Sequence, residues 1–63
     1  MEAWIADVVG KMHVNKIRQY ELAEALGYTR EYVGMVLTGK RTPKDAERLF
    51  TSAVDALIEQ KQT

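Results

Sequence analysis

The residues of this sequence that are best suited to a chemical role are basic side chains in the middle of the chain. The chain has nine basic and nine acidic residues, so its formal net charge is zero. Residues 11–44 include seven basic and three acidic residues, so this segment has a charge of +4 and the two ends together have −4. The bases are Lys11, Lys16, Arg18, Arg30, Lys40, Arg41 and Lys44. Because phosphate attraction depends on the local field, the segment favours a nucleic-acid partner, although ordinary solvated surface charge would give the same counts.

The other residue types exclude most kinds of catalytic site. Cysteine is absent, so disulfides, thiolate nucleophiles and thiolate metal ligands are excluded. The single histidine, His13, cannot build a metal site alone and fits a helix end. The only serine, Ser52, lies in a helical pattern without an evident base, and no glycine-rich phosphate loop follows a strand. We therefore expect no enzyme activity, no cofactor and no metal site.

Length and hydropathy favour one small cytoplasmic domain. With 63 residues, the chain is expected to form a single domain over residues 1–63. A chain of this size removes only about 60% of its unfolded surface from water, so every apolar stripe is needed for the core. No apolar run approaches the roughly 20 residues needed to cross a bilayer, and the N-terminus lacks the basic region of a signal peptide. We expect no membrane segment.

The elements that must position the basic residues are predicted to be helices. Proline occurs once, at Pro43, and no stretch alternates apolar and polar residues as a strand would. The apolar stripe of the first helix comprises Trp4, Ile5, Val8 and Met12. That helix is predicted to end near His13, with Asn15 in the left-handed conformation. The second helix is predicted from about Arg18 to Leu26, with Gly27 as its C-terminal glycine.

Start and stop signals predict two further helices. Thr29 is a good N-cap for a helix that stops at Thr38-Gly39 and buries Val33, Val36 and Leu37. The stretch Thr42-Pro43-Lys44-Asp45 then combines a threonine cap, a proline at the first helical position and an acid three residues after the cap. It predicts a fourth helix that reaches about Gln60. The apolar positions of this helix are Ala46, Leu49, Phe50, Ala53 and Leu57, with Val54 and Ile58 beside them.

Small residues in the middle of the chain would allow two short helices to cross steeply. Ala23 lies where the two backbones would approach, and Gly27 can adopt the left-handed turn between them. With this spacing, the stretch "QYELAEALGYTREYVGMVLTGKR", Gln19 to Arg41, resembles the helix-turn-helix family of phage repressors and Cro proteins, often called XRE-type. The resemblance implies an all-α fold: a compact four- to five-helix bundle that contains a helix-turn-helix and is lambda repressor-like.

The resemblance also implies a function. Members of this family are usually sequence-specific DNA-binding transcriptional regulators, commonly dimers on a two-fold operator. The helix at about residues 29–38 would lie in the major groove of double-stranded DNA, while the helix that begins near Arg18 would sit across the backbone. The implied DNA-contacting residues are Arg18, Gln19, Thr29, Arg30, Glu31, Tyr32, Gly34, Met35, Lys40 and Arg41.

Matched to the family position by position, these residues are expected either to contact the DNA backbone or to contact bases. Gln19 matches a glutamine that commonly touches a phosphate, although a plain exposed residue would also fit. Lys40 and Arg41 match a loop that approaches the sugar-phosphate backbone. Arg30 would hold the O6 and N7 atoms of a guanine with two hydrogen bonds, and Glu31 would accept from a cytosine amino group or form a local salt bridge instead.

The middle of the expected recognition helix departs from the family's pattern. Tyr32 would reach a phosphate or a thymine methyl, or else be a partly exposed packing residue. Gly34 and Met35 occupy places where many relatives expose polar base-reading side chains. Glycine permits close backbone approach, and methionine offers flexible apolar contact. We therefore expect base readout from the start of the helix, by Arg30 and Glu31, together with the shape of the DNA.

A second hypothesis is a protein-interaction module that uses the same fold without binding DNA. In that case Tyr32 and Met35 would form an apolar patch, and the acidic ends would keep the protein off DNA. A homodimer is a further expectation, since some apolar residues exceed what a single helix face needs and are available for a two-fold contact. These residues are Trp4, Val54, Leu57 and Ile58.

Overall fold

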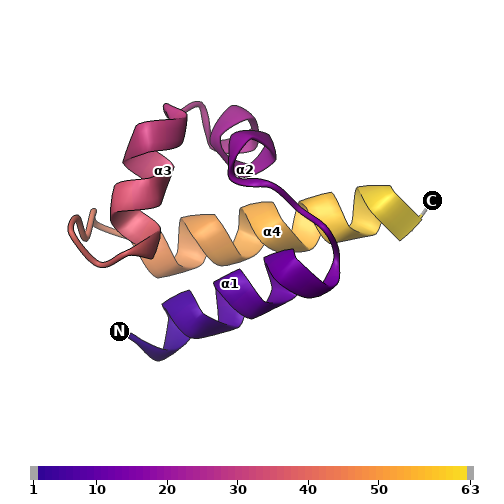
Figure 1. Ribbon diagram of the computed structural model, residues 1–63, viewed down its shortest axis with the longest axis horizontal. Helices are drawn as coiled ribbons and strands as arrows, with labels where there is room; N and C mark the ends of the chain where they lie inside the picture. The colour runs from indigo at the N-terminus through magenta and orange to yellow at the C-terminus, as the bar shows by residue number, and fades with distance from the viewer. Residues whose placement is uncertain (1, 63) are drawn as a thin grey trace.

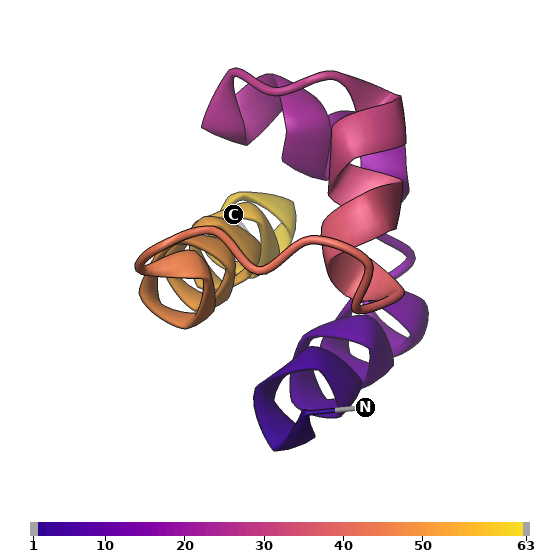
Figure 2. The same ribbon diagram turned by 90° about the vertical axis from the view of Figure 1, so that its left-hand side faces the viewer.

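Four α-helices make up residues 2–62, which are the residues described by this computed structural model. They are α1 (Ala3–Val14), α2 (Gln19–Leu26), α3 (Arg30–Leu37) and α4 (Ala46–Gln62), and no strand occurs in this range. α1 and α4 lie side by side and run in the same direction, with α2 and α3 on one side of them (Figure 1). Viewed nearly along α4, the other three helices arch around it (Figure 2). The all-α prediction is confirmed.

The core between the helices is built from their apolar stripes. The largest fully buried side chains are Ile5, Val8, Leu22, Val33, Val36, Phe50 and Val54. The rings of Trp4 and Phe50 meet edge to face with centroids 5.9 Å apart, which joins the first turns of α1 and α4. No polar or charged side chain of residues 2–62 is buried, so this core depends on the burial of apolar surface.

Three of the helices end in the same hydrogen-bonded motif. After α1, the N–H of Ile17 donates to the carbonyl oxygen of Met12 at 2.8 Å. The ends of α2 and α3 repeat this bond between residues five apart. This is the Schellman motif, in which the residue after the C-cap is left-handed. The left-handed residues are Lys16, Gly27 and Gly39, with φ angles of 58°, 75° and 83°. This confirms the predicted role of Gly27.

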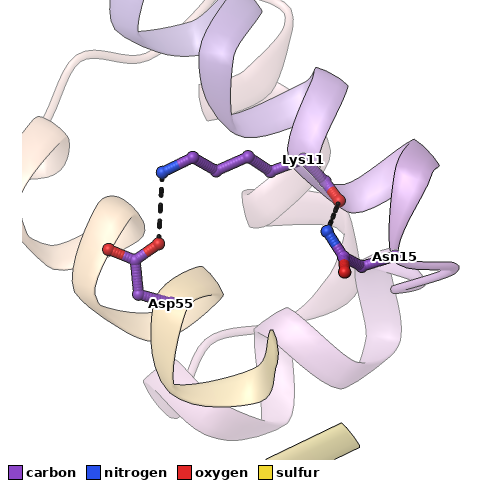
Figure 3. Close-up of polar contacts among 3 residues, drawn as sticks. All are labelled: Lys11, Asn15 and Asp55. Atoms are coloured by element: carbon purple, nitrogen blue, oxygen red, sulfur yellow. Dashed lines mark hydrogen bonds and ion pairs between the residues drawn. The ribbon is translucent and has the colours of Figure 1, made fainter. Parts of the chain in front are cut away.

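The left-handed residue after α1 is Lys16, so the prediction of Asn15 for this role is wrong. α1 continues through Val14, and Asn15 is its C-cap with φ −97°. The side-chain amide of Asn15 donates to the carbonyl oxygen of Lys11 at 2.8 Å (Figure 3). The backbone N–H of Asn15 donates to the same carbonyl oxygen at 3.0 Å, so Asn15 remains part of the last turn and the chain reverses one residue later.

The start of α4 also differs from the prediction, because the helix begins at Ala46 and not behind a cap at Thr42. Asp45 has a φ of 63°, in the left-handed region, so the helix cannot extend back through it. The N–H of Ala46 donates to the carbonyl oxygen of Pro43 at 3.1 Å and closes a separate turn. The predicted start signal thus forms a turn ahead of the helix. α4 itself is one continuous helix from Ala46 to Gln62.

Candidate functional site

The exposed side of α3 is positioned by the turn that joins it to α2. Residues 27–29 form this turn, and the two helices cross steeply in both views (Figures 1 and 2). The Oγ1 atom of Thr29 accepts a hydrogen bond from the N–H of Tyr32 at 3.1 Å, so the predicted N-cap is confirmed. Val33, Val36 and Leu37 are buried as predicted. The opposite side of α3 therefore faces solvent.

Gln19 of α2 meets that exposed side of α3. A shallow hollow is lined by Gln19, Arg30, Glu31 and Gly34, and we call it the Gln19–Gly34 hollow. A Cβ atom built on Gly34 would lie 3.6 Å from Oε1 of Gln19, so the amide of Gln19 extends over α3 at its glycine. A neighbouring hollow is lined by Arg18, Gln19, Tyr20 and Arg30. Five of the ten predicted contact residues therefore lie around Gln19 and Arg30.

Tyr20 belongs to this surface, although no role was predicted for it. It is the second residue of α2, and its side chain is 57% exposed beside Arg18 and Arg30. The available signal was its position outside the buried stripe of Leu22 and Ala23, because a large aromatic ring off that stripe must face solvent.

Tyr32 is half-buried, and its ring packs inside the molecule. It meets the ring of Tyr28 edge to face, with centroids 4.9 Å apart and an interplanar angle of 72°. Tyr28 in turn lies 6.3 Å from the ring of Phe50 in the core. Of the roles open to Tyr32 in the sequence, this geometry favours packing. Met35, by contrast, remains 38% exposed on the solvent side of α3.

Lys40 and Arg41 lie at the other end of α3 from Arg30. Their backbone N–H groups both donate to the carbonyl oxygen of Met35, at 2.9 and 3.3 Å, which holds the loop against the end of the helix. Thr38 also caps this end, because its hydroxyl donates to the carbonyl oxygen of Gly34 at 2.9 Å. The side chains of Lys40 and Arg41 are exposed, and they do not line the hollows beside Gln19.

The cations of residues 2–62 divide by position into paired and unpaired groups. Three form ion pairs: Lys11 with Asp55 at 3.2 Å (Figure 3), Arg48 with Asp45 at 3.4 Å, and Lys61 with Glu21 at 3.2 Å. All three paired cations lie on α1 or α4. The cations without an ion pair to another described residue are Lys16, Arg18, Arg30, Lys40, Arg41 and Lys44. The segment that includes α2 and α3 therefore keeps its positive charges available.

Glu21 is the acid of this segment whose charge is balanced within the molecule. Its side chain accepts a hydrogen bond from the backbone N–H of Arg18 at 3.0 Å and forms the ion pair with Lys61. The backbone hydrogen bond chiefly, and then Lys61, hold the pKa of Glu21 below its ordinary value. Glu24 and Glu31 form no ion pair with another described residue, so the predicted local salt bridge of Glu31 is not formed.

The apolar residues predicted to be left over for a two-fold contact all pack on the core, three of them only in part. Val54 is fully buried, and Trp4, Leu57 and Ile58 are partly buried against the core. The large apolar side chains exposed in residues 2–62 are instead Val9, Val14, Tyr20 and Met35. They lie on three different helices, so they do not form one continuous apolar face on a single element.

The described part of the chain has neither a cluster of metal ligands nor a helix suited to a bilayer. No three His, Asp or Glu side chains of residues 2–62 gather as a metal ion would require. None of the four helices combines the length and the apolar character needed to span a bilayer. Comparisons with protein-family models, with curated proteins and with solved structures found no match to this chain.

Proposed function

We propose that the protein is a transcriptional regulator that binds double-stranded DNA sequence-specifically in the cytoplasm. In this proposal, α2, the turn at residues 27–29 and α3 form a helix-turn-helix within a lambda repressor-like bundle. α3 lies in the major groove, and α2 crosses the sugar-phosphate backbone. Arg30 holds a guanine, and Lys40 and Arg41 position the backbone.

The observation that carries this proposal is the placement of unpaired cations at both ends of α3. Arg30 begins the helix, and Lys40 and Arg41 follow it; all three are exposed, and none is paired with another described residue. A helix of this length spans about 12 Å, comparable to the width of the major groove. Cations at its two ends would therefore contact one stretch of DNA together, although the net charge of the chain is zero.

Selection of bound sites from a random DNA pool, followed by fluorescence anisotropy, tests the proposal. We expect the selected site to be bound with an affinity that falls as salt rises, because phosphate contacts release counterions. The double variant Arg30→Ala/Lys40→Ala should lose about 1–3 kcal/mol of discrimination at one G·C pair. It should also have a salt slope reduced by about one, since a phosphate contact is lost.

The control is a double variant with the same change in net charge. Lys11→Ala/Arg48→Ala removes two cations that are already paired with Asp55 and Asp45, away from α3. It should bind the selected site nearly as the wild type does. The proposal fails if the wild type shows no binding even at low salt, or if the two double variants bind equally well.

The interaction-module hypothesis has less support from the same surface. It needs an apolar patch made by Tyr32 and Met35, but the ring of Tyr32 is half-buried against Tyr28. Met35 alone, which is 38% exposed, offers only a small apolar contact. A stable protein partner recovered together with an absence of DNA binding would favour that hypothesis instead.

A homodimer is proposed only on DNA. Two copies would be brought together by adjacent half-sites of a two-fold operator, since none of the apolar residues expected to join them is fully exposed. Selected sites with two inverted half-sites would support this arrangement, and a single half-site would contradict it.

A further inference from the structure

The amide of Gln19 is placed to do more than touch a phosphate. Its oxygen lies 3.6 Å from the point that a Cβ on Gly34 would occupy, so it projects over the middle of α3 and not only over the start of α2. Within residues 2–62, no hydrogen bond engages this amide, and the side chain is exposed. A donor and an acceptor are thus free on the side of α3 that carries Arg30.

Gly34 is the reason that the amide can lie there. Of the two helical glycines, Gly10 has no other side chain of residues 2–62 within 4 Å of an added Cβ, whereas Gly34 has the Gln19 side chain in reach. A methyl group at 3.6 Å would make an ordinary contact, but a longer side chain at this position would share the hollow with the amide. The glycine therefore leaves a site on α3 that a residue from α2 fills.

We infer that Gln19 reads a base through this gap, namely the adenine of one A·T pair beside the guanine read by Arg30. This inference rests on the proposed DNA binding. A carboxamide offers one donor group and one acceptor, and adenine presents N7 as acceptor and its N6 amino group as donor in the major groove. A phosphate accepts only, so a phosphate contact would use the NH2 group of Gln19 and leave its oxygen without a donor.

The neighbouring side chains fit the same assignment. Arg30 and Glu31 line the hollow with Gln19, so three side chains with different hydrogen-bonding patterns face the same short stretch of DNA. Arg30 selects guanine, Glu31 accepts from a cytosine amino group, and Gln19 supplies the pattern that matches adenine. The middle of α3, where Gly34 itself carries no side chain, is thereby read from α2.

The test measures base preference and not affinity alone. On the selected site, each position is changed to the other three bases, and dissociation constants are measured for the wild type and Gln19→Ala. We expect the wild type to prefer adenine at one position by about 5- to 150-fold, the range for a good bidentate pair. Gln19→Ala should lose this preference while keeping the guanine preference of Arg30. The matched control is Gln62→Ala, which changes an exposed glutamine at the far end of α4.

A second pair of variants tests the role of the gap. Gly34→Leu should displace the amide and lose the same adenine preference, whereas Gly10→Leu, placed where nothing lies nearby, should bind as the wild type does. Circular dichroism of each variant checks that the helices are retained. If Gln19→Ala weakens binding to all sequences equally, with every base preference intact, Gln19 is a phosphate contact and the inference is wrong although the DNA-binding function stands. Absence of sequence-specific binding by the wild type overturns both.

Discussion

Lys16, which follows the C-cap of α1, adopts a left-handed conformation that costs a residue with a side chain about 1–2 kcal/mol. The equivalent residues after α2 and α3 are Gly27 and Gly39, which adopt positive φ without this steric cost. We expect Lys16→Gly to raise the free energy of unfolding by about 0.5 kcal/mol, because relief of the strain exceeds the added flexibility of the unfolded chain. Urea unfolding followed by circular dichroism measures the change.

Two variants separate the backbone effect at Lys16 from its charge. Lys16→Ala removes the charge but keeps the Cβ atom, so its free energy of unfolding should stay within about 0.5 kcal/mol of the wild type. Gly39→Ala introduces a Cβ at φ 83° and should be less stable by about 1 kcal/mol. If Lys16→Gly is no more stable than Lys16→Ala, backbone strain does not explain the end of α1.

Among the elements, α3 depends on its N-cap, whereas α4 does not use the cap that the sequence offers. Thr29 accepts the N–H of Tyr32, so Thr29→Ala should lower the free energy of unfolding by about 1 kcal/mol. Thr42 lies ahead of a helix that begins at Ala46, so Thr42→Ala should change it by less than about 0.5 kcal/mol. Chemical unfolding of the two variants gives the comparison, and equal losses would contradict this assignment of the caps.

These two threonines also indicate what sequence reasoning could predict. The cap at Thr29 and the turn at Gly27 depend on neighbouring residues, so local rules were sufficient for the start of α3 and the end of α2. The start of α4 depends instead on the path of the loop back to the core, where Ala46 is buried behind the left-handed Asp45. No local signal distinguishes that turn from the first turn of a helix.

The candidate site shows the same division between local and long-range information. Exposure of Arg30 followed from the apolar period of α3, because it lies outside the buried stripe, and exposure of Lys40 followed from its place in a polar loop. The proximity of Gln19 to Gly34 was not predictable, since it depends on how α2 and α3 cross. Packing of Tyr32 against Tyr28 is local in sequence, but it was one of several roles open to Tyr32, and Tyr28 is held in place by a long-range contact with Phe50.

Glu21, near the start of α2, forms an ion pair with Lys61 near the end of α4. Its pKa is lowered chiefly by the hydrogen bond from Arg18 and then by Lys61, so the folded protein favours the ionised carboxylate. This contribution to stability is complete above the ordinary pKa of 4.5 and is lost as the pH falls through the lowered value. We expect Glu21→Gln to be less stable than the wild type at neutral pH, with a difference that shrinks as the pH falls below 4.5.

Unfolding by urea at a series of pH values measures this difference. Glu24→Gln is the control, because Glu24 lies on the same helix, is exposed and forms no ion pair with another described residue. Its free energy of unfolding should stay close to that of the wild type at every pH. A difference between Glu21→Gln and the wild type that does not change with pH would contradict the proposed role of the carboxylate.

For the whole molecule, the distribution of charge and apolar surface determines whether two copies of the protein associate. The paired cations hold α1 and α2 to α4 or lie at the start of α4, while the unpaired cations surround α2 and α3. The face proposed for DNA would therefore repel the same face of a second copy in the absence of DNA. DNA supplies the negative charge that allows two copies to lie close together.

The free protein is accordingly expected to be a monomer. Val54 is fully buried, and the residues Trp4, Leu57 and Ile58 are packed against the core, so no residue predicted for a two-fold contact is left fully available. Sedimentation equilibrium of the free protein at several concentrations should give the chain mass of 7.2 kDa throughout. A complex that contains two chains should appear only with DNA that carries two half-sites. If the free protein instead shows a doubled mass that rises with concentration, the exposed side of α1 is the surface to test. Val14→Glu places a charge at a side chain that is 77% exposed there, and it should then restore the monomer.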